Sequence, residues 1–248
     1  MSVTEKEFED ELETFRVSVG TATQFFYAFQ TIHFLSSQDK AVLSLLNQAP
    51  VFWNTNIGAL REAMFISLGR IFDKDKRTHN VDKLLKVAQD TPELFKASAP
   101  RWCKQGDASK HFDYVASIYE PNLRDWLRLE THVSNWRKVY VANYQSIRDK
   151  MYGHRERISL DKKVDLFNQT NYMELEKLFA FLDALHEALW WLYYNGHKPV
   201  IRYRRRSLMQ MFTSEIAGQR GLTAGELVAQ DARKFLESHA SRNRTKES

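Results

Sequence analysis

The sequence predicts an all-α protein, an antiparallel bundle of several long helices. Apolar residues recur at spacings of three and four over long stretches, the periodicity of amphipathic helices. No stretch alternates apolar and polar residues well enough to predict a sheet. Glycine (9) and proline (5) are also scarce among the 248 residues, which argues against a turn-rich all-β chain.

The first third of the chain predicts three helices. An aromatic-rich segment from Phe15 to Phe34 forms the first, and a shorter one lies before Pro50. A stripe of apolar residues at helical spacing then predicts the third helix: Ile57, Leu60, Met64, Leu68 and Ile71. The pattern is more broken up to Pro121, where Asn80 can cap one short helix and Thr91-Pro92 can open another.

Two further long helices follow. The first is expected to start with Pro121 in its first turn and to run to Met151. Its apolar stripe is Leu123, Trp126, Leu129, Val133, Trp136, Tyr140, Tyr144, Ile147 and Met151. The second carries a stripe of leucines between a cap at Thr170 or Asn171 and a stop at Gly196. These are Leu175, Leu178, Leu182, Leu185, Leu189 and Leu192.

The charge distribution divides the chain into a bundle over residues 1–197 and a basic helical extension over 198–248. The net charge is +5, and the extension holds 11 basic against 5 acidic residues. Its helices are expected around Leu208 and after Thr223, where Thr223 and Glu226 form a capping-box pattern, and the end from Ser241 reads as a disordered tail. Basic extensions attract polyanions, although a solvated tail has the same composition.

The sequence lacks the features of several classes of protein. Cys103 is the only cysteine, so neither an internal disulfide nor a cysteine-based zinc site is expected. Nucleotide-binding glycine loops and metalloprotease motifs are missing, so no metal or other cofactor is expected. The longest apolar run, Ala188 to Tyr194, is too short to span a membrane, and the acidic N-terminus does not resemble a signal peptide. We therefore expect a cytoplasmic protein without membrane contact.

One cluster of chemically capable residues stands out at the end of the helix after Pro121. Arg148 is followed by Asp149 and, six positions on, by His154. The spacing is not specific by itself, because Arg233 and His239 repeat it. The residues leave two simpler interpretations open: His154 is a satisfied core histidine, and Arg148 with Asp149 is a surface ion pair.

These residues resemble the R-[polar]-x(4–6)-H signature of the HEPN superfamily of all-α ribonucleases. A second segment, Ser67-Leu-Gly-Arg-Ile-Phe-Asp73, with the capped helix from Asn80, is similar to the AbiU-type abortive-infection branch. The two segments anchor a resemblance over roughly residues 5 to 197. Gly153 stands where many members carry a residue such as alanine, and the region after 197 has no counterpart.

The resemblance implies a metal-independent endoribonuclease of a phage-defence or toxin–antitoxin system, in which the ribose 2′-OH attacks the adjacent phosphate. His154 would act as general base or acid, Arg148 as phosphate clamp and Asp149 as an orienting group. Substrate-side residues would be Tyr152 and Arg155. Further substrate contacts are expected from the arginines of the extension: Arg202, Arg204, Arg205 and Arg206.

The partners expected are RNA, a second copy of the chain and a cognate antitoxin. On a continuous helix, six positions leave Arg148 and His154 about 120° apart. A composite site across a twofold dimer would resolve this, and members of the superfamily typically pair their motifs in that way.

Two alternative functions remain open. The chain can be a catalytically inactive bundle that binds RNA or a protein partner. It can also be a DNA-binding regulator in which helices over Leu208–Ala217 and Thr223–Ser238 form a helix-turn-helix unit.

Overall fold

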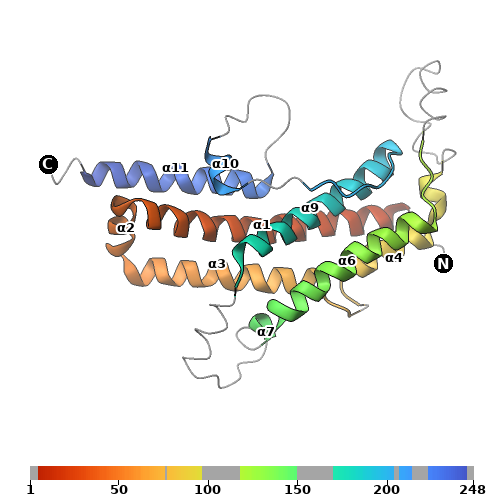
Figure 1. Cartoon of the computed structure of the whole chain (residues 1–248), viewed down its shortest axis with the longest axis horizontal. Helices are drawn as coiled ribbons and strands as arrows, with labels where there is room; N and C mark the ends of the chain where they lie inside the picture. Colours follow the sequence, from red (N-terminus) through yellow and green to blue (C-terminus); the bar gives the residue numbers. More distant parts are fainter. Residues whose placement is uncertain are drawn as a thin grey trace, which may run out of the picture.

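The computed structural model describes residues 5–75, 77–96, 118–149, 170–203, 207–213 and 223–244. All regular secondary structure in these ranges is helical, and no strand occurs among them. The all-α prediction is therefore confirmed. Long helices lie side by side in layers, with α1 in the middle of the stack (Figure 1).

Helix α1 (Glu5–Gln38) is the helix around which the others pack. Its 34 residues span about 50 Å. It contacts α2, α3, α4, α9, α10 and α11. Four consecutive residues, Phe26 to Phe29, are all buried. Because consecutive helical residues point in directions about 100° apart, α1 is covered from several sides at this level.

Helices α2 (Lys40–Asn47) and α3 (Pro50–Ile71) bring the chain back along α1. The Asp39 side chain caps α2 by accepting a hydrogen bond from the Ala41 N–H at 2.8 Å. Pro50 occupies the first position of α3, where its missing N–H costs nothing. Helix α3 then lies antiparallel to α1 (Figure 1).

The next elements are short, as their broken pattern predicts. Helix α4 (Val81–Asp90) begins after Asn80, whose side chain accepts a hydrogen bond from the Lys83 N–H at 2.9 Å. This is the predicted cap. The segment opened by Thr91-Pro92 is a single 3₁₀ turn, η1 (Pro92–Phe95).

Helix α6 (Leu123–Asn143) ends earlier than predicted. Asn122 and Asp125 form a capping box at its start, so Pro121 lies before the helix and not in its first turn. The continuous helix expected to reach Met151 is interrupted at Tyr144. A short α7 (Gln145–Ile147) follows, and Arg148 and Asp149 continue it in a π-helical conformation to the end of the described segment. The Tyr144 side chain is fully buried, and its hydroxyl donates to Glu174 Oε1 at 2.7 Å. The helix is thus interrupted at Tyr144, the residue that makes this long-range hydrogen bond, and no local sequence pattern predicts such a contact.

Helix α9 (Tyr172–Asn195) follows the prediction closely. Asn171 caps its start by accepting from the Glu174 N–H, and Gly196 ends it with φ 59°. The six leucines of the predicted stripe are all 0% exposed. The stripe is therefore a packed core seam.

The C-terminal region adds α10 (Leu208–Thr213) and α11 (Ala224–Arg244). The predicted capping box is present: the Thr223 N–H donates to Glu226 Oε2 at 2.8 Å, and the Glu226 N–H donates to Thr223 Oγ1 at 3.3 Å. Helix α11 lies along α1 and runs in the same direction (Figure 1). It reaches Arg244, so it includes the first residues of the segment expected to be disordered.

Small residues allow α11 to lie close to α1. A Cβ on Gly225 would stand 2.5 Å from the Tyr27 ring. Further along, Leu236 and Ala240 are buried in one cluster with Ile32 and Leu35 of α1. The extension therefore buries an apolar face against the bundle.

A buried carboxylate joins α1 to α4. Glu11 is 3% exposed, and it contacts Lys83 Nζ at 2.6 Å and His79 Nδ1 at 2.9 Å. A buried charge is stable only where it is paired and hydrogen-bonded, so these contacts determine how the start of α4 sits on α1.

Replacement of this carboxylate is expected to destabilise the fold. Glu11→Gln removes the charge that pairs with Lys83, and we expect it to lower the free energy of unfolding in urea by about 1–3 kcal/mol. Glu13→Gln is the matched control on α1. Its partner Arg16 forms an exposed pair with it, worth less than about 1 kcal/mol. Equal losses in the two variants would contradict the role assigned to Glu11.

The fold is also expected to weaken in mild acid because of His186 on α9. Burial, and secondarily the Arg16 charge, lower the pKa of His186 to about 4, although Glu13 acts in the opposite sense. Between pH 6.5 and 4 the unfolded chain binds a proton at this residue that the folded chain does not. Stability therefore falls as the pH falls through this window, by about 1.4 kcal/mol per pH unit. Urea midpoints from pH 7 to 4.5 should fall less for His186→Gln than for the unsubstituted protein.

Candidate functional site

Arg148 and Asp149 lie immediately after α7, and each side chain is about one-third exposed. Arg148 Nε donates to Asp149 Oδ1 at 2.7 Å, and Nη2 lies 2.6 Å from the same oxygen. Gln145 Nε2 donates to the second carboxylate oxygen at 3.3 Å. The two neighbours thus form the ion pair that their residue types allow, and it is accessible to solvent.

The aliphatic part of Arg148 packs on Gly69 in α3. A Cβ on Gly69 would stand 2.2 Å from Arg148 Cδ and 2.9 Å from Nη1. Only glycine leaves this space for the arginine. The contact brings together the two sequence segments that resemble the AbiU-type branch, Ser67–Asp73 and Arg148–Asp149.

The Tyr140 hydroxyl lies beside Gly69 and Arg148 as well. It would be 3.1 Å from a Cβ on Gly69, and the residue is 3% exposed. The Tyr140 ring stacks on Phe72 with centroids 5.2 Å apart. Within the described ranges the hydroxyl has no hydrogen-bond partner of good geometry. Burial raises the pKa of Tyr140 to about 12 despite the nearby Arg148 charge, so the phenol stays protonated.

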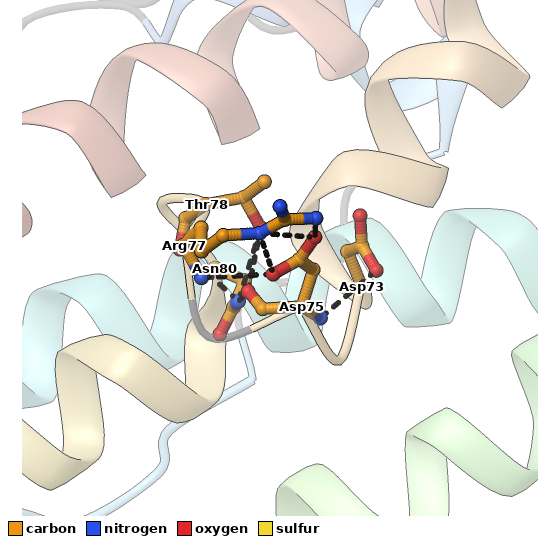
Figure 2. Close-up of polar contacts among 5 residues, drawn as sticks. All are labelled: Asp73, Asp75, Arg77, Thr78 and Asn80. Carbon is orange, nitrogen blue, oxygen red and sulfur yellow. Dashed lines mark hydrogen bonds and ion pairs between the residues drawn. The ribbon is translucent and has the colours of Figure 1, made fainter.

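The loop after α3 carries a second carboxylate, Asp73, which is close enough to Arg148 to raise the pKa of its guanidinium. Figure 2 shows how side chains tie this loop to its own backbone. Asp73 Oδ1 accepts from the Asp75 N–H at 3.1 Å, and Asp75 pairs with Arg77 Nη2 at 2.7 Å. Asn80 Nδ2 donates to the Asp75 carbonyl at 2.9 Å. The loop is therefore held by its own polar contacts, which fixes the Asp73 carboxylate.

Arg148 is charged at neutral pH, as arginines are, and its neighbours reinforce this. Its partial burial acts to lower the pKa of the guanidinium, but the hydrogen bond with Asp149 and the proximity of Tyr140, Asp149 and Asp73 raise it, with a net upward shift. A charged, pre-positioned guanidinium is a strong ligand for two oxygens of one phosphate. A phosphate that binds here has to share or replace the contact with Asp149.

Stacked aromatic rings hold this part of α6 against α3. Phe65 stacks on Tyr144 and Phe72 stacks on Tyr140, with centroids 6.1 and 5.2 Å apart. Tyr144 also ties α6 to the start of α9 through Glu174. The site thus lies where α3, α6 and α9 meet.

Gly69, Tyr140 and Asp73 were not assigned a role from the sequence. The signal for Gly69 is a glycine inside a strongly periodic helix, which costs about 1 kcal/mol and indicates a packing reason. Tyr140 belongs to an apolar stripe and reads as core. Nothing in the sequence pairs it with Gly69.

Of the other predicted site residues, the structure describes Arg202. Residues 150–169, which include Tyr152, His154 and Arg155, lie outside the described residues, as do Arg204, Arg205 and Arg206. Arg202 is exposed and lines a groove beside Trp191, near the C-terminal end of α9. The Arg148 site contacts the N-terminal end of that helix, so Arg202 and Arg148 are not brought together.

In the described ranges, no three side chains of His, Cys, Asp or Glu are grouped so that they could hold a metal ion. None of the helices in those ranges is both long and apolar enough to cross a membrane.

The contact between Gly69 and Arg148 predicts that Gly69→Ala lowers the free energy of unfolding when Arg148 is present but not when it is replaced by alanine. Gly69→Ala should destabilise the protein to urea, because Cβ displaces Arg148. In an Arg148→Ala background the same change should be neutral or stabilising by up to about 1 kcal/mol, through helix propensity. Gly58→Ala on the same helix is the control, since a Cβ there meets nothing within 4 Å. It should stabilise both backgrounds equally. The same effect of Gly69→Ala in both backgrounds would rule out the contact.

Comparison with known proteins agrees with the resemblance seen in the sequence. The model of the HEPN family AbiU2 matches residues 5–209, most of the chain and all of the helices that form the site. No match was found among the curated proteins or among the solved structures. The chain belongs to the AbiU2 family of the HEPN superfamily.

Proposed function

We propose that this protein is a metal-independent endoribonuclease of a phage-defence or toxin–antitoxin system. The observation that carries the proposal is the Arg148 guanidinium, charged and one-third exposed, seated on Gly69 where the two segments of the family pattern meet. Membership of a HEPN family supports a role in RNA cleavage and abortive infection.

The proposed reaction is an intramolecular transfer of phosphate. His154 takes the proton of the ribose 2′-OH, the 2′-oxygen bonds to phosphorus, and the bond from phosphorus to the 5′-oxygen breaks. The leaving oxygen takes up a proton, so the products are a 2′,3′-cyclic phosphate and a 5′-OH. Arg148 contacts the non-bridging oxygens and stabilises the charge that builds there in the transition state. Asp149 holds the guanidinium in position before the phosphate arrives.

The remaining assignments follow from the sequence. Tyr152 and Arg155 contact the nucleotides beside the scissile bond. The arginines of the extension hold the RNA backbone at a distance from it: Arg202, Arg204, Arg205 and Arg206. The active form is a homodimer in which the twofold mate completes the site, and a cognate antitoxin restrains it.

Cleavage of total RNA in EDTA tests the reaction, because a metal-independent ribonuclease survives chelation. We expect His154→Ala and Arg148→Ala each to reduce the rate at least about 100-fold, the usual effect of losing a proton-transfer or charge-stabilising group. Arg124→Ala, at an exposed arginine of α6, is the control and should cut at the normal rate. The products should end in a 2′,3′-cyclic phosphate.

Three results would contradict the proposal in different ways. Normal cleavage by His154→Ala would remove that residue from the mechanism. Binding of RNA without cleavage would identify an inactive HEPN bundle. Tighter binding to duplex DNA than to RNA in a salt titration would identify a DNA-binding regulator.

A further inference from the structure

The end of α9 carries two stacked rings. Gly196 ends the helix in the left-handed conformation, and the His197 N–H donates to the Trp191 carbonyl at 3.2 Å. This turn places the His197 ring parallel to the Trp191 indole, with centroids 5.2 Å apart and an interplanar angle of 7°. The neighbouring Trp190 and Tyr194 are also exposed, at 38% each, and Trp191 is 42% exposed.

A groove of about 260 Å³ opens beside these rings. One wall is the side of α9, and the other is the segment that follows Gly196. The lining residues that matter here are Trp191, His197, Lys198, Arg202 and Glu187. The groove therefore combines two aromatic rings with two permanent positive charges and one carboxylate.

Contacts with other parts of the fold fix the second wall. The Tyr119 N–H donates to the Gly196 carbonyl at 2.7 Å, and Arg128 Nη2 donates to the Pro199 carbonyl at 2.8 Å. The Tyr203 hydroxyl accepts from Trp136 Nε1 at 3.3 Å. The groove is thus formed before any ligand binds.

The chemistry of the groove fits a single-stranded nucleic acid. Exposed aromatic rings stack on unpaired bases, and nearby cations neutralise the phosphates. Lys198 and Arg202 are both exposed, and the chain continues from them into Arg204, Arg205 and Arg206. An apolar protein partner would not require this concentration of positive charge beside the rings.

We propose that this groove binds single-stranded RNA, with a base packed against the exposed part of the stacked Trp191 and His197 rings and the flanking phosphates on Lys198 and Arg202. The proposal rests on the proposed function, since it names a second contact of the same substrate. Glu174, at the start of α9, contacts Tyr144 near the Arg148 site. Trp191 lies 17 residues further along α9, so the groove and the Arg148 site are separated by about 25 Å along this helix. RNA recognition would then extend well beyond the scissile phosphate.

Fluorescence anisotropy with a labelled oligouridylate of about 12 nucleotides tests this binding. The probe carries 2′-O-methyl groups, which remove the nucleophile of the proposed cleavage, so binding is measured independently of any reaction. The variants are Trp191→Ala, Trp191→Phe and Lys198→Ala. Phe52→Ala is the control, because Phe52 is an exposed aromatic residue of α3, at 59%.

Trp191→Ala should weaken binding between about 5- and 150-fold, the effect expected from losing one base–aromatic stack. Trp191→Phe should retain most of the affinity, and Phe52→Ala all of it. Lys198→Ala should reduce the slope of log affinity against log salt by about one.

Any of three results would overturn the proposal. The first is unchanged binding by Trp191→Ala, and the second is equal affinity for a duplex of the same length. The third is a change of oligomeric state in Trp191→Ala by light scattering, which would make this face a contact between two copies. Normal probe binding without cleavage of natural RNA would support the groove and contradict the ribonuclease.

Discussion

The apolar surface of α1 is the constraint on which the arrangement of the other helices depends. Because Phe26 to Phe29 are all buried, partners are needed in several directions at one level of the helix. Phe26 packs on Phe179 of α9 with ring centroids 5.0 Å apart, and Tyr27 lies against Gly225 of α11. The basic extension therefore contributes to the core: α11 covers a face of α1 that would otherwise expose aromatic side chains to water.

The covering of α1 also creates the junction at which the candidate site lies. Helix α3 returns along α1, and α6 is held on α3 by two pairs of stacked rings. The anchoring of Tyr144 to α9 coincides with the end of α6, and the next residues carry Arg148 over Gly69. A guanidinium that is held in this way loses little conformational freedom when it binds a phosphate.

Charge and aromatic residues are distributed unevenly along the molecule. Near the N-terminal end of α9, a single partly exposed guanidinium, Arg148, is paired with Asp149 beside a buried phenol. Near the C-terminal end, exposed rings and separate cations form an open groove. Under the proposed function, the first is the site of cleavage and the second holds the flexible strand with less specificity.

Local patterns in the sequence predict the helices and several of their ends, although α1 begins before the expected Phe15 and α6 differs from the prediction at both ends. The leucine stripe of α9, the caps at Asn80 and Asn171 and the Thr223–Glu226 capping box each involve residues within a few positions of one another. The sequence also led to the proposal of Arg148 and Asp149 as site residues, through a resemblance to a family whose model matches residues 5–209. Only the tertiary structure shows the break at Tyr144, the packing of Arg148 on Gly69, the position of Tyr140 beside Gly69 and the docking of α11 on α1. Each of these depends on a contact between residues about 30 to 200 positions apart or on the fit of one side chain over another, and neither is contained in a periodic pattern.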